Sequence, residues 1–362
     1  MSNEEKLREL EAEMARTQKN KATEYHIGLL KAKIAKLKRE IIAPKKSGVK
    51  TGGFDVKKSG DATVVFIGLP SVGKSTLLNA LTGAKSKIAS YAFTTLTCIP
   101  GVMEYGGAKI QLLDLPGIIA GAKDNKGRGK EVMAVARNAD LVLILLDVFQ
   151  PEILPTIKEE LGGIGIRLDQ EPPHIYITKK QRGGVEINAT VPLTKLNEKM
   201  VVGILNEYGI HNAAVVFRQD ATVEQLIDVL AGNRKYNRSL VVLNKVDMVK
   251  EEYLKSLNFE FLPISAEKNE NIEMLRAKIF ERLSLMKVYT KPRADKADMT
   301  EPMMMRTGAT IEDACGRLHR DLARDFKYAL IWGKSAKFPG QKVGLTHVLQ
   351  DGDVFSIIKK QG

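Results

Sequence analysis

The stretch Gly68-Leu-Pro-Ser-Val-Gly-Lys-Ser-Thr76 decides the fold of this chain. It follows an apolar run at residues 63–67 and precedes a helix-compatible run at residues 77–81. The sequence therefore predicts a strand, a tight loop and a helix in direct succession. A glycine-rich loop between a strand and a helix gathers backbone N–H groups at the positive end of the helix, which is the usual form of an anion site.

The spacing of the residues in this loop specifies the anion. The loop fits the pattern G-x-x-x-x-G-K-S, in which the lysine reaches the β- and γ-phosphates of a nucleotide and the hydroxyl binds Mg²⁺. A glycine-rich turn can match by chance, but the flanking strand and helix favour a phosphate loop. We expect nucleotide contacts from Gly68, Ser71, Val72, Gly73, Lys74, Ser75 and Thr76.

Two later segments are predicted to sense the terminal phosphate. Residues 91–97 are polar and lack helical periodicity, and we choose Thr95 over Thr94 as the residue that completes the Mg²⁺ shell. An apolar strand then ends at Asp114, followed by Leu-Pro-Gly117. The Asp114 carboxylate is expected to hold Mg²⁺ through water, and the Gly117 N–H to meet the γ-phosphate.

The run Leu240-Val-Val-Leu-Asn-Lys-Val-Asp247 predicts the base. A carboxylate accepts hydrogen bonds from guanine N1–H and N2–H₂ together, and adenine lacks this pair of donors, so Asp247 selects GTP over ATP. Asn244 either binds the base or ties this loop to the phosphate loop, and the stem of Lys245 is expected to lie over the ring. In the later pair Ser265-Ala266, the backbone N–H of the alanine is expected to meet guanine O6.

Length and composition set the broad class. A chain of 362 residues is long enough for two or three domains. Only Cys98 and Cys315 are present, which excludes a disulfide framework and favours a reducing, cytoplasmic compartment. No apolar run reaches about 18 residues, so we expect no membrane association.

The basic charge is concentrated near the amino terminus. Residues 14–60 carry 13 lysines and arginines against three acidic residues, which indicates a polyanionic partner, most simply the ribosome or structured RNA. Apolar residues at helical spacing predict two amphipathic helices, over residues 7–14 and 27–41, joined as a hairpin. Packing on the rest of the protein and RNA binding are equally favoured roles for this hairpin.

About ninety residues separate the expected strand at residues 141–148 from the one that begins at Leu240, more than a minimal core needs. Within them, residues 166–235 are predicted to form a small α+β insertion. Its expected strands are 174–178, 185–191 and 213–218, and its expected helices are 194–207 and 222–230.

The carboxyl-terminal segment begins near residue 290. A capping box at residues 310–313 predicts a helix whose apolar face carries Ala314, Leu318, Leu322 and Phe326. Strands are expected at residues 328–332 and 354–358. Trp332, the single tryptophan, is expected in the core rather than on a base-stacking surface.

The ordered motifs, together with Y-A-F-T-T-L and D-L-P-G-I-I-A-G-A-K-D-N-K-G-R-G, resemble those of the DRG (developmentally regulated GTP-binding) subfamily of Obg-like GTPases, in an archaeal-type form. The resemblance implies a TRAFAC-type P-loop NTPase with a doubly wound, mostly parallel α/β sheet and a β-grasp TGS domain. The expected parts are a basic helical arm (1–60), the GTPase core (61–165 and 236–289), the insertion (166–235) and the TGS domain (290–362).

The resemblance further implies a translation-related switch that binds GTP or GDP with Mg²⁺ and hydrolyses GTP, with Lys74, Thr95 and Gly117 as catalytic groups. Ile118 stands where Ras-like enzymes have a water-orienting glutamine, so we expect slow turnover and a stimulating protein partner. Ser71 stands where many potassium-assisted relatives have asparagine, which leaves K⁺ dependence open. Ala120 and Asn125 also depart from eukaryotic relatives.

Three functions stay possible at this point. The first is the GTP hydrolase described above. The second is an RNA-binding adaptor that keeps GTP as a structural ligand with little turnover, which Ile118 favours. An Obg-like ATPase is the third possibility, and Asp247 argues against it.

Overall fold

The structure is a computed structural model that describes residues 2–18, 20–42, 60–82, 99–114, 135–136, 138–291, 299, 302–319 and 321–360. The chain divides into two compact units, Met1–Gly53 with Leu161–Tyr236 and Phe54–Glu160 with Asn237–Gly362. The predicted site residues Thr95 and Gly117, and Ile118 with them, lie outside the described residues. Within those residues, no helix has the length and apolar character needed to span a bilayer.

The sheet that the phosphate loop predicts has the strand order β10-β9-β4-β1-β3-β2, and β5 pairs with β9. Neighbouring strands on the main path are parallel except β2, which runs antiparallel to β3. The doubly wound, mostly parallel fold is therefore confirmed. The strands are β1 (Ala62–Ile67), β2 (Ile99–Tyr105), β3 (Ala108–Asp114), β4 (Leu141–Asp147), β5 (Ile166–Leu168), β9 (Lys235–Asn244) and β10 (Leu262–Pro263).

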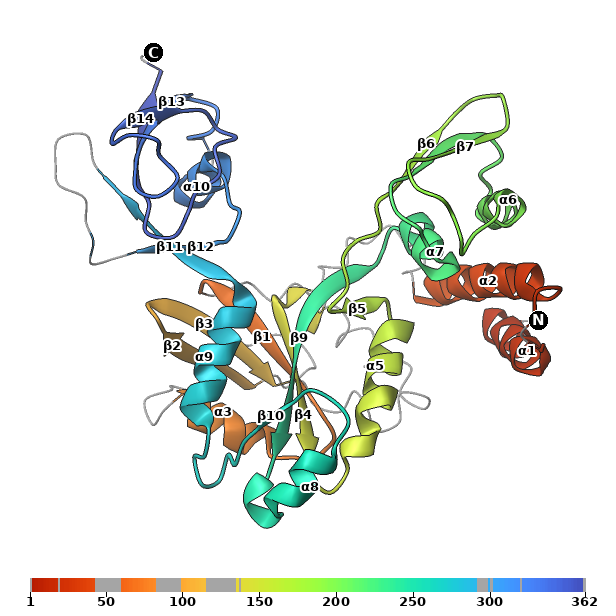
Figure 1. Ribbon diagram of the computed structural model, residues 1–362, viewed down its shortest axis with the longest axis horizontal. Helices are drawn as coiled ribbons and strands as arrows, with labels where there is room; N and C mark the ends of the chain where they lie inside the picture. Colours follow the sequence, from red (N-terminus) through yellow and green to blue (C-terminus); the bar gives the residue numbers. More distant parts are fainter. Residues whose placement is uncertain are drawn as a thin grey trace. The chain divides into compact units, whose positions relative to one another are not determined.

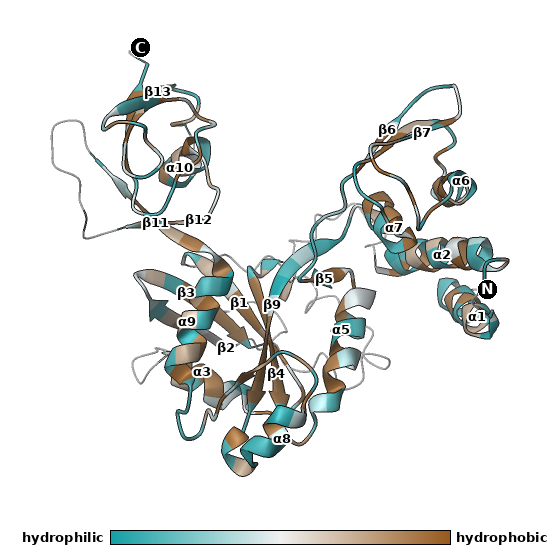
Figure 2. Cartoon of the chain, viewed as in Figure 1, coloured by the Kyte–Doolittle hydropathy of each residue, from teal (hydrophilic) through white to brown (hydrophobic). Residues whose placement is uncertain are grey.

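Helices cover both faces of this sheet, which explains why β1 and β4 are continuous apolar runs (Figures 1 and 2). Leucines of α3 (Lys74–Thr82) and apolar residues of α9 (Ile272–Leu283) share one buried cluster with the strands. Helix α5 (Leu154–Gly163) lies on the opposite side, preceded by the short turn η1 (Pro151–Ile153). The short helix η2 (Val246–Met248) and helix α8 (Glu251–Ser256) follow β9.

The insertion is the predicted α+β unit. Its sheet has the order β6-β8-β7, built from β6 (Ile175–Lys179), β7 (Val185–Ala189) and β8 (Ala213–Phe217) and accompanied by α6 (Glu198–Glu207) and α7 (Val223–Ala231). Helix α6 begins four residues later than expected. Asn197 caps it by accepting from the Met200 N–H, whereas Thr194 donates its hydroxyl to Asp220 at 2.5 Å and so belongs to the preceding loop.

The amino-terminal helices α1 (Asn3–Arg16) and α2 (Glu24–Ile42) confirm the predicted pair, and α2 packs on the insertion. Ala32 of α2 is fully buried in the same cluster as α6 and α7. Two glycines permit this close approach: a side chain at Gly28 would meet Met200, and one at Gly203 would press on the Tyr25 hydroxyl at 2.7 Å. The apolar stripe of α2 is thus an internal packing face.

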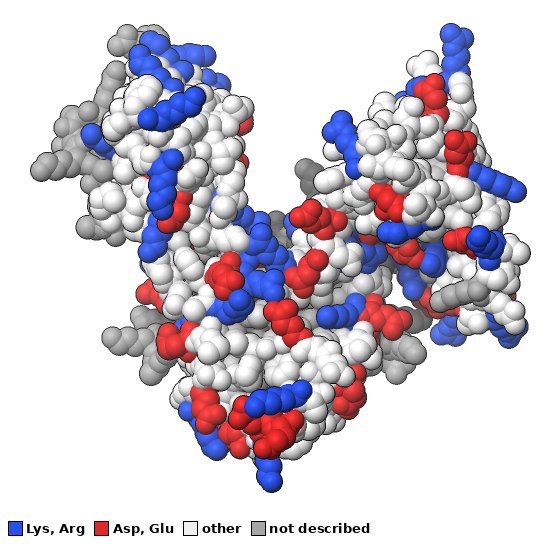
Figure 3. Space-filling view, in the orientation of Figure 1, with Lys and Arg blue, Asp and Glu red and all other residues white. Residues whose placement is uncertain are grey.

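The lysines of α2 contact acidic and carbonyl groups of the same unit, and acidic side chains lie among the basic ones over this unit in Figure 3. Lys31 pairs with Glu224, and Lys38 lies 2.8 Å from Glu11 of α1. Lys36 donates to the backbone carbonyl of Glu207 at 2.8 Å. Part of the basic charge that suggested an RNA partner is therefore matched internally.

The carboxyl-terminal domain contains a five-stranded sheet of order β12-β11-β15-β13-β14 and the helix α10 (Ile311–Leu318). The capping box at Thr310 is confirmed. The expected apolar face is wrong beyond the first turns, because the extended backbone of His319 ends the helix, Leu318 is exposed, and Phe326 lies in a strand. The strands are β11 (Leu285–Thr290), β12 (Met303–Arg306), β13 (Phe326–Trp332), β14 (Gln341–Val343) and β15 (Val354–Lys359).

Candidate nucleotide-binding site

The loop between β1 and α3 has a backbone that only small residues permit. Gly73 has φ +92°, and a side chain there would collide with the amide of Asn244. A side chain at Gly68 would likewise collide with the carbonyl of Leu145 in β4. Lys74 opens α3 and donates to the carbonyls of Gly68 at 3.0 Å and Leu69 at 2.8 Å. Its ammonium group therefore stays at the mouth of the loop, where phosphate oxygens would replace these carbonyls.

Asp114 reaches the same place from the end of β3, where it pairs in register with Phe66 of β1. Burial raises the pKa of the Asp114 carboxyl, while the charge of Lys74 and a hydrogen bond from Ser75 lower it. Burial also lowers the pKa of Lys74, which the Asp114 charge opposes. The Oδ1 atom of Asp114 is buried and has no hydrogen-bond partner among the described residues. A buried carboxylate oxygen without a partner, beside a serine hydroxyl, fits the donor set of a hydrated Mg²⁺ ion.

Asn244, at the end of β9, joins the phosphate loop to the base-reading loops. Its side chain is 3 % exposed, its Nδ2 donates to the Val72 carbonyl at 2.8 Å, and its Oδ1 accepts from the Ala266 N–H at 3.0 Å. Of the two roles left open by the sequence, the structure thus shows the tie between loops. The Ala266 N–H is already donated to Asn244, so a guanine O6 must share or displace that hydrogen bond.

Asp147 is a site residue that the sequence reasoning missed. It ends β4 in register with Asn244, and its Oδ2 lies 2.6 Å from the Nζ of Lys245. The same ammonium group donates to the Ser71 carbonyl at 3.2 Å. Lys245 has a left-handed backbone, φ +67°, that turns its stem toward these partners. The sequence did contain a signal for Asp147, because this carboxylate directly follows the apolar run of β4.

Asp247 is held ionised beside this loop. The Ser265 hydroxyl and then Lys268 lower the pKa of the Asp247 carboxyl, and the Lys268 ammonium lies 3.2 Å away. Guanine recognition needs the ionised form, because only a carboxylate accepts two hydrogen bonds from the base edge. Lys268 was not singled out from the sequence.

The structure therefore brings the predicted residues of three loops to one edge of the sheet. These are the carboxyl ends of β1, β3 and β9, where doubly wound sheets bind ligands. Ser75 and Thr76 lie exposed in the first turn of α3.

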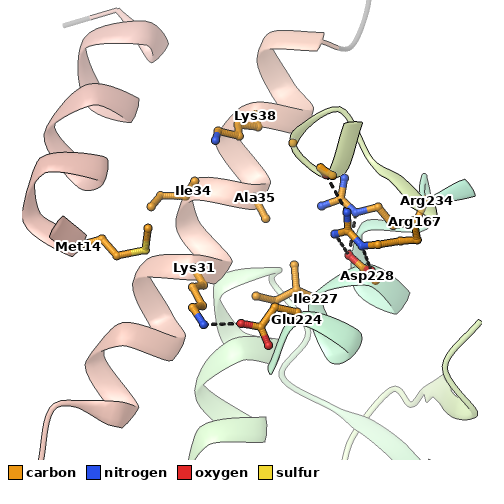
Figure 4. Close-up of a pocket in the computed structure, with 12 residues that line it drawn as sticks. Met14, Lys31, Ile34, Ala35, Lys38, Arg167, Glu224, Ile227, Asp228 and Arg234 are labelled. Atoms are coloured by element: carbon orange, nitrogen blue, oxygen red, sulfur yellow. Dashed lines mark hydrogen bonds and ion pairs between the residues drawn. The ribbon is translucent and has the colours of Figure 1, made fainter. Parts of the chain in front are cut away.

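A separate pocket of about 220 Å³ lies in the first unit, between α2 and α7 (Figure 4). Asp228 is buried there and accepts from Arg167 at 2.7 Å and from Arg234 at 2.8 Å. Lys31 pairs with Glu224 at the rim. No predicted nucleotide-site residue lines this pocket.

Models of known protein families match consecutive parts of the chain. Three family models match: "50S ribosome-binding GTPase" over residues 63–180, the "C-terminal region of MMR_HSR1 domain" over residues 182–285, and "TGS domain" over residues 286–359. Among solved structures, the YchF GTPase of Schizosaccharomyces pombe is 14 % identical, with a TM-score of 0.45 over 83 % of this chain and 99 % of that one.

Full-length relatives are far more similar. A GTP-binding protein of Methanocaldococcus jannaschii is 53 % identical over 100 % of this chain and 94 % of its own length. Developmentally-regulated GTP-binding protein 2 of Homo sapiens is 51 % identical over 98 % of this chain and 99 % of its own. With a glycine-rich loop between β1 and α3 and relatives of this similarity along its whole length, the chain belongs to the developmentally regulated GTP-binding (DRG) family of GTPases.

Proposed function

We propose that this GTP-binding protein is a slow, cytoplasmic GTP hydrolase that acts as a translation-related switch on the ribosome or structured RNA. The observation that carries the proposal is the double hydrogen bond of Asn244, which makes the phosphate loop and the base-reading loops one rigid frame. A frame that joins these loops favours a ligand with both a guanine base and phosphates.

The residues at the loop mouth have distinct roles in this proposal. Lys74 leaves the carbonyls of Gly68 and Leu69 to bind the β- and γ-phosphates, and Ser75 and Asp114 hold Mg²⁺, the latter through water. The metal supplies charge that stabilises the transferring phosphoryl group. Thr95 and Gly117 are proposed to order around the γ-phosphate and to relax after hydrolysis.

Slow turnover is expected from the residue that follows Gly117. Ile118 cannot orient a water molecule by hydrogen bonding, so an added group is needed, from a stimulating protein partner, the ribosome or K⁺. The proposal keeps five parts: the basic arm (1–60), the GTPase core in two parts (61–165 and 236–289), the insertion (166–235) and the TGS domain (290–362). The arm, the insertion and the TGS domain are the parts proposed to contact RNA.

Single-turnover hydrolysis of GTP tests the proposal, with and without ribosomes and with K⁺ or Na⁺. We expect slow cleavage by the free protein, faster cleavage with ribosomes, and none by Lys74→Ala. Lys255→Ala is the matched control, because Lys255 lies exposed on α8 and pairs with Glu251 of the same helix. Unchanged hydrolysis by Lys74→Ala would refute the role of that lysine.

Stimulated cleavage, measured together with the affinities for GTP and ATP, separates the alternatives. Tight GTP binding without any stimulated cleavage would favour the adaptor that holds GTP as a structural ligand. Equal affinity for ATP and GTP would favour an ATPase and contradict the role of Asp247.

A further inference from the structure

The sheet of the carboxyl-terminal domain has one face that its own helix does not cover. Ala329 and Ile331 of β13 point to the buried cluster that contains Ala314 of α10. Because side chains alternate along a strand, Tyr328 and Trp332 lie on the opposite face. The expectation that Trp332 is a core residue is therefore wrong: it is half-buried and outside that cluster.

Lysines lie over both aromatic rings of this face. The Lys342 ammonium is 5.0 Å from the centre of the Tyr328 ring, and the Lys291 ammonium is 4.7 Å from the Trp332 ring. Lys342 comes from β14, where it pairs in register with Leu330 of β13. Each of the two rings on this face thus has a lysine ammonium group over it.

The loop between β13 and β14 extends this face beyond the end of the strands. Gly340, with φ +76°, lies against the indole of Trp332, so the loop is in contact with the aromatic face. Two residues earlier, Phe338 is 60 % exposed, and Lys334 and Lys337 are exposed beside it in sequence. An exposed phenylalanine has no polar group to satisfy in water, so its ring is available for stacking.

Lysines predominate in the segment that forms this face, and two aspartates, Asp325 and Asp351, stand at its two ends. Residues 326–350 contain four lysines and no aspartate or glutamate. Asp353, which follows them, is fully buried and accepts from the backbone N–H of Ser335 at 3.2 Å and of Gln350 at 2.7 Å. Figure 3 shows lysine and arginine side chains gathered at the end of this domain where β13 and β14 lie. Lys334, Lys337 and Lys342 have no acidic residue within eight positions in the sequence.

We propose that these residues form a binding surface for single-stranded RNA, an inference that rests on the proposed association with RNA and names its contact. The lysine–aromatic surface consists of Tyr328, Trp332, Lys334, Lys337, Phe338 and Lys342. Its occupant is an unpaired segment whose phosphates meet the lysines and whose bases stack on the rings.

The combination of groups favours this occupant. An acidic peptide needs the positive charge but not the flat rings. An anionic membrane can also take up an exposed ring such as Phe338, so binding to anionic vesicles is measured as a competing outcome. Duplex RNA offers phosphates but keeps its bases stacked inside, away from Phe338 and Trp332. Rings flanked by cations match an unpaired strand, which presents a phosphate and a base face at every nucleotide.

The single tryptophan makes the test direct. The full chain is titrated with an unstructured oligoribonucleotide of roughly 12 nucleotides, and Trp332 fluorescence is followed together with the anisotropy of a label on the RNA. We expect saturable quenching at the same RNA concentration as the anisotropy change. Phe338→Ala should weaken binding about tenfold, and Phe338→Trp should restore it.

Lysine variants test the phosphate contacts by salt dependence. The log–log slope of affinity against salt falls by about 0.7 per phosphate contact on a single strand, so Lys334→Gln with Lys337→Gln should reduce the slope by about 1.4. The charge-matched control is Lys250→Gln with Lys255→Gln. Lys250 caps the start of α8, Lys255 lies in its last turn, and both are exposed. Val348→Ala, which removes an exposed apolar side chain elsewhere in the domain, controls for Phe338.

The outcomes separate this inference from the proposed function, because GTP affinity is measured on every variant. RNA binding that is unchanged in the Phe338 and lysine variants overturns the inference, even where GTP binding and stimulated hydrolysis stand. Equal binding to phosphatidylserine vesicles, polyglutamate or duplex RNA also overturns it. Loss of RNA affinity with GTP affinity intact supports it.

Discussion

Replacing Asn244 with alanine should separate the phosphate loop from the base-reading loops. The substitution removes the donor to the Val72 carbonyl and the acceptor of the Ala266 N–H. Ala266 is 4 % exposed, so its N–H gains little from water in place of the lost partner. The two loops then have to be ordered by the nucleotide itself, and part of the binding free energy is used for that ordering.

The size of the effect follows from the two hydrogen bonds. Each contributes a net of about 0.5–1.5 kcal/mol, so the pair contributes about 1–3 kcal/mol. At about 1.4 kcal/mol per tenfold change, the Kd for GTP should rise by about 5- to 150-fold. GDP affinity should fall by a similar factor, because both nucleotides use the same frame.

Titration with a fluorescent GTP analogue measures this change, and hydrogen exchange of the Val72 and Ala266 segments measures the loosening of the loops. Asn79→Ala is the matched control, because Asn79 lies exposed on α3. An Asn244→Ala protein with wild-type GTP and GDP affinity would show that the tie between the loops contributes nothing to binding and would refute this role of Asn244.

Three further predictions concern the carboxylates of the site. Asp247→Asn should weaken GTP binding about 100-fold or more and create a preference for xanthosine triphosphate, measured by competition. Asp147→Ala removes the carboxylate 2.6 Å from Lys245 and should weaken GTP about tenfold without that switch of base, which a competition series distinguishes. Burial raises the pKa of Asp114 above its ordinary value of 3.8; its contribution to stability is therefore present at pH below that value and is lost as the pH rises through the folded-state pKa. Asp114→Asn should thus raise the free energy of unfolding of the nucleotide-free protein at neutral pH, with the gain vanishing in acid, while Mg²⁺-dependent GTP binding falls; a less stable variant at neutral pH would contradict this.

The sequence predicted those parts of the site that a local pattern encodes. The loop at Gly68 and the strand ends at Asp114 and Asn244 each carry their polar residues within a few positions of an apolar run. Asp147 was missed because its partner Lys245 lies 98 residues away, and the pairing exists only once β4 and β9 are adjacent. No local pattern states which strands are neighbours.

Periodicity alone also failed where two elements follow one another closely. Leu318, Leu322 and Phe326 continue the helical spacing of α10, yet the helix ends at Leu318 and Phe326 belongs to β13. The lysines of α2 were judged by their own helix, whereas Glu224 and Glu207, which Lys31 and Lys36 contact, lie in the insertion. Both the end of α10 and the surroundings of the α2 lysines depend on contacts with distant segments, which the local pattern does not contain.

The packing of α2 on the insertion has a consequence during synthesis. Ala32 leaves the ribosome long before Met200 and Ile227, the residues of its cluster in α6 and α7. At about 5–20 residues per second, the gap lasts on the order of 10–40 s. During that time the first unit cannot fold, and the apolar stripe of α2 is open to chaperones or to wrong partners. Helix α2 is made before the insertion but acquires its native contacts with α6 and α7 only after the first part of the GTPase core, residues 61–165, has been synthesised.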